Sequence, residues 1–194
     1  MSIKETVIDI LCSPAAQGIR FSFNSVTQTP VEVSGVSFRR VARAIEHRKI
    51  KVIDDLRLLQ PGSDGEYWGE NVFIVPPTRH RRYQEAVVVH EAVHASFDLT
   101  HSHVPAIDNE VAAYIAGTIY LRRTGFPRGG YNATLEEYAL PIANSVLRSA
   151  PIEDRDLEKL RHVLLHDKLY YDLLTNRKEG HGAAPIYLLD VGDG

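Results

Sequence analysis

The sequence from position 79 to position 99 reads RHRRYQEAVVVHEAVHASFDL. It contains neither proline nor glycine, and four consecutive apolar residues precede its second histidine, so it predicts a buried helix. His90 and His94 are four residues apart, which places both side chains on one face with Cβ atoms about 5–6 Å apart. Two imidazoles at that spacing can reach one zinc ion, to which histidine nitrogen binds at about 2.0–2.1 Å.

Glu91 lies between the two histidines and is the candidate general base. It lies about 100° round the helix from His90, so it faces a water molecule on the metal and not the metal itself. The pattern H-E-x-x-H thus supplies two zinc ligands and one general base from a single helical turn. The two histidines and the glutamate predict zinc-dependent hydrolysis.

The composition and charge limit the classes of protein to which this chain can belong. With 194 residues, of which 44% are hydrophobic, the chain is expected to form one globular domain, 1–194. The net charge of −3 gives no basic field for nucleic acid or an anionic membrane. Cys12 is the only cysteine, which excludes an internal disulfide and a multi-cysteine zinc site. Lys4 and Asp9 interrupt any signal peptide, so we expect a soluble protein made in the cytoplasm, with export by a signal-free route left open.

Hydrophobic periodicity and turn residues predict an α+β fold with a small N-terminal β-sheet and a helical C-terminal part. Ser37 and Asp108 are expected to cap helices, and the tail 176–194 is expected to be mobile, with a possible strand at 186–189. The expected strands are 50–59, 66–68 and 72–75, with 21–33 either a strand or an extended loop. The expected helices are 2–11, 37–48, 79–99, 108–123, 134–148 and 153–174.

A catalytic zinc takes a third protein ligand. Asp98 continues the histidine stripe, but the eight residues from His90 rise about 12 Å along a helix, so it cannot bind the same ion. It could orient His94 instead. A third histidine in the pattern H-E-x-x-H-x-x-G-x-x-H is not available, because Thr100 occupies its position and the required methionine turn has no methionine beyond Met1.

The remaining candidates are Glu110 and the loop histidines His101 and His103. Glu110 follows a loop in which the chain can reverse, so its helix can lie antiparallel to the first. Glu110 shares a face with Ala113 and Gly117, and such small residues allow two helices to approach closely. We therefore expect Glu110 to be the third ligand. Only six residues separate His101 from His94, and eight separate His103 from it. The helix must also end within this span, which leaves little chain for either histidine to reach the metal.

The stretch H-E-x-x-H followed by N109-E110-x-x-A113 resembles the gluzincin branch of zinc metallopeptidases, most closely the small bacterial ImmA/IrrE-type enzymes. The resemblance covers about residues 67–120. It implies a zincin-like fold, His90, His94 and Glu110 as zinc ligands and Glu91 as general base. It also implies that residues 72–75 form the edge strand to which a substrate backbone adds.

That family also supplies a tyrosine or histidine that stabilises the oxyanion. We take His166 as the candidate, from the second i, i+4 pair formed with His162, and retain His162, Tyr114 and Tyr131 as rivals. The second pair lacks the glutamate that follows His90, so a separate metal site there is disfavoured.

These observations predict a zinc endopeptidase that binds one zinc ion and a peptide or protein substrate, without nucleic acid or membrane partners. One alternative is an amidase or toxin that acts on a cell-wall or other non-protein substrate. The other is a metal-stabilised regulatory or binding module with little turnover. The sequence leaves the oligomeric state open.

Overall fold

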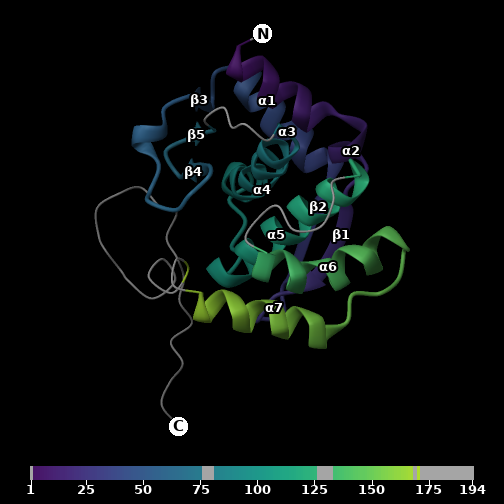
Figure 1. Cartoon of the computed structure of the whole chain (residues 1–194). Helices are drawn as coiled ribbons and strands as arrows, with labels where there is room; N and C mark the ends of the chain where they lie inside the picture. The colour runs from purple at the N-terminus through teal and green to yellow at the C-terminus, as the bar shows by residue number, and fades with distance from the viewer. Residues whose placement is uncertain (1, 76–80, 126–132, 168–169, 171–194) are drawn as a thin grey trace.

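The helix that carries the two histidines, α4 (Arg81–Leu99), lies in the middle of the molecule (Figure 1). The structure is a computed structural model that describes residues 2–75, 81–125, 133–167 and 170. The apolar run before the motif, residues 86–89, is buried on every side, as are Ala92 and Val93. Residues 86–89 span a full helical turn, so their burial confirms the predicted buried helix.

The second central helix, α5 (Ala106–Arg123), packs on α4. Gly117 faces α4, because a Cβ atom there would lie in ordinary van der Waals contact with it, 3.4 Å from the carbonyl oxygen of Ala86 and 3.9 Å from Cβ of His90. Glu110, at the other end of α5, lies beside His94. The two helices are therefore antiparallel, as the sequence predicted.

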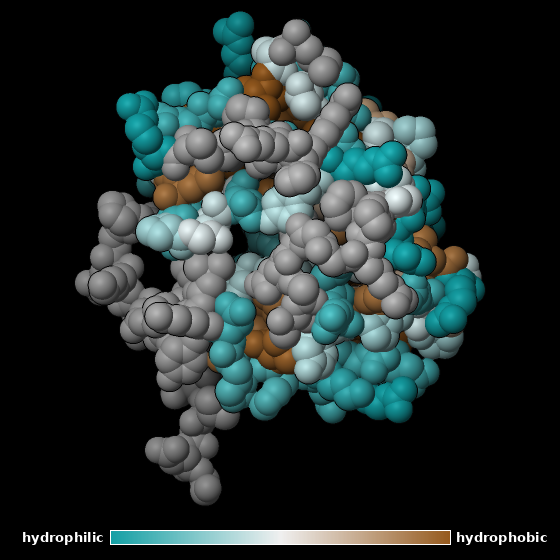
Figure 2. All heavy atoms as spheres, in the orientation of Figure 1, coloured by the Kyte–Doolittle hydropathy of each residue, from teal (hydrophilic) through white to brown (hydrophobic). Residues whose placement is uncertain are grey.

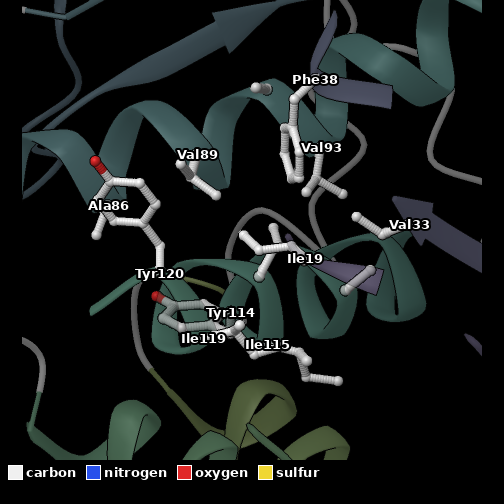
Figure 3. Packing of buried hydrophobic residues seen from close by; sticks show 14 of the residues in the cluster. Ile19, Val33, Phe38, Ala86, Val89, Val93, Tyr114, Ile115, Ile119 and Tyr120 are labelled. Atoms are coloured by element: carbon white, nitrogen blue, oxygen red, sulfur yellow. The ribbon is translucent and has the colours of Figure 1, made fainter. Parts of the chain in front are cut away.

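The other helices enclose this pair. α1 (Ile3–Cys12) and α3 (Gly35–Glu46) contact α4, and α6 (Ala133–Leu147) and α7 (Asp154–His166) contact α5, whereas the short α2 (Pro14–Gln17) bridges α3 and α5. Figure 3 shows Val89 and Val93 of α4 in one cluster with Ile115 and Ile119 of α5. The hydrophobic core thus lies directly behind the histidine motif.

Two expected helix caps are wrong. The N-cap of α3 is Ser34, and the hydroxyl of Ser37 instead accepts from the Ser34 amide at 3.3 Å. The N-cap of α5 is Pro105, and Asp108 lies inside the first turn, fully buried. The Ser34–Ser37 bond lies within the first turn of α3, whereas the Asp108 carboxylate binds the distant Val26 and Arg161, which local sequence does not record.

The first sheet is the antiparallel hairpin of β1 (Arg20–Asn24) and β2 (Pro30–Ser34). Its buried residues alternate along both strands, and they are Phe21, Phe23, Val31 and Val33. The stretch that the sequence left between strand and loop is therefore a hairpin.

The second sheet has the strand order β3-β5-β4, with β3 (Lys51–Ile53), β4 (Glu66–Trp68) and β5 (Val72–Ile74). β5 pairs with β3 in parallel and with β4 antiparallel, so it is the central strand. The expectation that residues 72–75 form an edge strand is wrong. The expected strand 50–59 ends at Ile53, and a 3₁₀ turn (Leu56–Leu58) follows. The edge strand that contacts α4 is β4.

The structure confirms a mixed α+β class in which helix predominates. On the face shown in Figure 2, hydrophilic residues prevail among the described atoms and hydrophobic ones form separate small patches. Among the described residues, no helix has the length and apolar character needed to cross a bilayer. The tail 176–194, with its expected strand at 186–189, lies outside the described residues.

Candidate metal centre

Three side chains from the two central helices converge at one point. Oε1 of Glu110 lies 3.6 Å from Nε2 of His94, and Oε2 lies 3.5 Å from Nε2 of His90. The three groups each offer one ligand atom, and these atoms lie within 4.8 Å of one another. The structure therefore brings together the three residues that the sequence predicted as ligands.

The Glu110 carboxylate fits a cation better than it fits its protein neighbours. Its Oε2 is buried and has no hydrogen-bond partner among the described residues, since 3.5 Å to His90 is too long for a good bond. A buried carboxylate oxygen without a partner is costly. Two imidazole nitrogens and one carboxylate form a donor set that divalent transition metals bind well.

The charges of the cluster influence one another strongly. Burial alone would lower the pKa of His90, but the carboxylates of Glu110 and Glu91 outweigh it and raise that pKa above its ordinary value. Burial would likewise raise the pKa of Glu110, but His94 and His90 lower it below the usual range. Glu110 is therefore held as a carboxylate, the form in which it can bind a metal.

Glu91 differs from Glu110 in its surroundings. Burial is the largest influence and raises its pKa, against the opposing effects of His90, His94 and the amide of Tyr67. A carboxyl group with a raised pKa is nearer to the working range of a general base at neutral pH. The surroundings therefore shift the pKa values of the two glutamates in opposite directions, that of Glu91 upward and that of Glu110 downward.

Asn109 orients one of the two imidazoles. Its Oδ1 lies 2.8 Å from Nδ1 of His94, so Nδ1–H donates to it and Nε2 is left free to bind a metal. The sequence suggested Asp98 for this role, and that suggestion is wrong. Asp98 accepts a hydrogen bond from the hydroxyl of Tyr67 at 2.7 Å, because it lies one turn beyond His94, where α4 meets β4.

The edge strand β4 holds Glu91. The main-chain N–H of Tyr67 donates to Oε2 of Glu91 at 2.8 Å, which leaves Oε1 facing Nε2 of His90 at 4.0 Å. Gly65 permits this approach, because a Cβ atom there would lie 2.4 Å from Cγ1 of Val87. Sequence analysis missed both roles. The only signal was the proximity of the G-E-Y-W stretch to a turn, which says nothing about contact with α4.

A pair of buried tyrosines lies on the other side of the cluster. The hydroxyls of Tyr114 and Tyr170 are 2.6 Å apart, and the ring of Tyr114 packs edge-on against His90 with centroids 4.8 Å apart. Burial raises the pKa of both hydroxyls, and the nearby Glu110 and Glu91 carboxylates raise them further. Both hydroxyls are therefore protonated and able to donate. Tyr170 was not among the donors that the sequence suggested.

The other candidates lie elsewhere. His162 and His166 are exposed on α7, and Nδ1 of His166 lies 2.7 Å from the carbonyl oxygen of His162 on the same helix. His101 and His103 are exposed in the loop between α4 and α5 and are not part of the ligand group. Tyr131 lies outside the described residues.

Comparisons with protein families, with curated proteins and with solved structures found no match for this chain. The assignment of this site therefore depends on its geometry and on the sequence motif.

The ligand set is testable by metal affinity. We expect Glu110→Ala to weaken metal binding at least tenfold, because it removes one of the three converging donors. A double variant, His101→Ala with His103→Ala, should bind as tightly as the original chain, since both side chains are exposed in the loop. The measurement is competition with a chromophoric chelator. Tight binding by Glu110→Ala together with metal loss in the double variant would overturn the assignment.

Proposed function

We propose that this chain is a zinc-dependent endopeptidase of zincin-like fold. The observation that carries the proposal is the Glu110 carboxylate, which lies between His90 and His94 with Glu91 beside them. Three nitrogen and oxygen donors from protein are the usual set of a catalytic zinc, which keeps its remaining position for water or substrate. A purely structural zinc would have no use for a buried glutamate next to the ligands.

His90, His94 and Glu110 would hold the ion. Bound zinc would act as a Lewis acid that polarises the scissile carbonyl and makes a coordinated water more acidic. Glu91 accepts the proton of the attacking water at its Oε1, because the Tyr67 amide occupies Oε2. The same carboxyl group then donates that proton to the leaving amine.

The substrate backbone would pair with β4 and not with the residues 72–75 that the sequence favoured. The amide of Tyr67 reaches Glu91 and not β5, so it lies on the outer side of β4. An extended peptide added along this edge would run past the general base and would pair with other backbone groups of β4, because the Tyr67 amide already donates to Glu91. β5 has no such free side, because β3 and β4 flank it.

The oxyanion donor that we favour is the Tyr114–Tyr170 pair. Its hydroxyls are buried and protonated beside the cluster, and a hydrogen bond between them leaves one proton to donate elsewhere. His166 is exposed and already uses Nδ1 at the His162 carbonyl. It remains a candidate through its Nε2, and a direct comparison decides between them.

Glu91→Gln should separate metal binding from turnover. The substitution keeps the side chain's shape and removes the base, so we expect about one equivalent of zinc to remain while peptide hydrolysis falls by roughly 10²–10⁴-fold. A library of peptides, assayed with and without chelator, gives the readout. Equal activity in the variant would refute the mechanism. Chelator-sensitive hydrolysis of cell-wall amides but of no peptide would favour the alternative of an amidase. Zinc binding without any turnover would favour the alternative of a regulatory or binding module.

A series at position 67 tests the main-chain amide of β4 that holds Glu91. Tyr67→Ala keeps the amide that holds Glu91, whereas Tyr67→Pro removes it, and proline is tolerated on edge strands. We expect the proline variant to lose at least tenfold more kcat/KM than the alanine variant, at unchanged zinc content. Phe73→Pro, in the central strand, should instead unfold the protein. Equal kcat/KM in the two Tyr67 variants would exclude the role of the amide.

The oxyanion donor is tested by comparing Tyr170→Phe with His166→Ala. Loss of one donor in an oxyanion site costs about 10²–10³ in kcat, so Tyr170→Phe should show that loss with little change in KM. His166→Ala should keep kcat within about twofold, since its side chain is exposed. The reverse result, a large fall in kcat only for His166→Ala, would restore the histidine as the donor.

A further inference from the structure

Asp108 is a fully buried carboxylate two residues before the proposed ligand Glu110 and next to Asn109. Both of its oxygens accept hydrogen bonds from distant segments. Oδ1 accepts from Nε of Arg161 at 2.8 Å and lies 2.6 Å from its Nη2, and Oδ2 accepts from the amide of Val26 at 2.8 Å. The carboxylate therefore ties the first turn of α5 to α7 and to the β1–β2 turn.

Arg161, the partner of Asp108, makes further contacts of its own. Its Nη2 also donates to the carbonyl oxygen of Asn24 at 2.8 Å, and its guanidinium lies over the ring of Phe23 at 5.9 Å. The arginine thus uses its planar fork on two acceptors and its face on an aromatic ring. One side chain of α7 joins the end of β1 to the beginning of α5.

Among the described residues, the N-cap of α5, Pro105, adds no side-chain hydrogen bond to the first turn of this helix. This turn nevertheless carries Asn109, which orients His94, and Glu110, which lies between the imidazoles. The negative Asp108 also suits the positive end of the helix dipole. The position of two metal-site residues therefore depends on the bonds that Asp108 makes.

We propose that Arg161 and Asp108 are positioning residues of the metal centre, and that α7 is a structural arm of that centre. Neither residue touches the metal, the substrate or the reacting atoms. They act through the first turn of α5, whose location sets where Asn109 and Glu110 present their oxygens. This inference rests on the proposed metal site and adds to it a dependence on a helix about 50 residues further along the chain.

The experiment measures zinc affinity in folded variants. Arg161→Met keeps the length and apolar contacts of the side chain and removes its bonds to Asp108, and Asp108→Asn keeps the shape and removes the charge. We expect zinc to bind about 10–100-fold more weakly in both, the loss typical of removing a group that orients a ligand. Arg161→Lys should recover part of the affinity, because its ammonium group can still pair with Asp108.

The matched control is Arg155→Met, on the same helix, where the arginine is exposed and lies 3.5 Å from Asp156. Its zinc affinity should equal that of the original chain. Each affinity is measured by chelator competition at a temperature where the unfolding curve of the zinc-free variant shows it fully folded. A merely structural role would lower the unfolding midpoint and leave the affinity of the folded protein unchanged.

Original affinity in folded Arg161→Met and Asp108→Asn would overturn the proposal. If Arg161→Met does not fold, the test uses Asp108→Asn and Arg161→Lys, because each keeps part of the hydrogen bonding between the two residues. Original zinc affinity in both of these variants would also overturn the proposal. Wild-type peptide hydrolysis is a separate readout that tests the peptidase proposal. A chain that binds zinc but cleaves no peptide would refute that function, whereas the affinities of the Arg161 and Asp108 variants would still test the positioning role.

Discussion

The packing of α5 on α4 places the Glu110 carboxylate within 3.6 Å of the imidazole of His94 and 3.5 Å of that of His90. The contact runs past Gly117 of α5, which faces Ala86 and His90 of α4. It also buries a carboxylate oxygen that no described neighbour satisfies. A buried polar atom is rarely left without a partner, so we propose that the helix pair holds a cation here.

The groups around this contact come from all sides of the fold. Asn109 fixes His94 from α5, the amide of Tyr67 fixes Glu91 from β4, and Arg161 fixes the first turn of α5 from α7. Each uses a short, directed hydrogen bond in a partly buried setting, where such bonds are stronger than in water. Positions within a few tenths of an ångström matter for a metal ligand or a base, and single bonds of this kind supply them.

The sequence predicted the central part of the site because that part is local. His90, Glu91 and His94 share one helical turn, and Glu110 follows a single chain reversal, so spacing and small residues were enough. The strand order was not predictable, because β3 and β4 both pair with β5 and no local pattern says which one flanks α4. Tyr170 and Arg161 were missed for the same reason, since their contacts with α5 span more than 50 residues.

No sequence motif indicates which group holds Glu91, because that group is a main-chain amide. The donor is the main-chain N–H of Tyr67, which every residue except proline would offer at that position. The side chain of Tyr67 helps to fix the strand against α4, because its hydroxyl donates to Asp98, two turns along α4 from Glu91. The motif on α4 therefore indicates the chemistry that we propose for the site. Its geometry depends on backbone atoms of β4 and on a buried ion pair, neither of which leaves a pattern in the residues around His90.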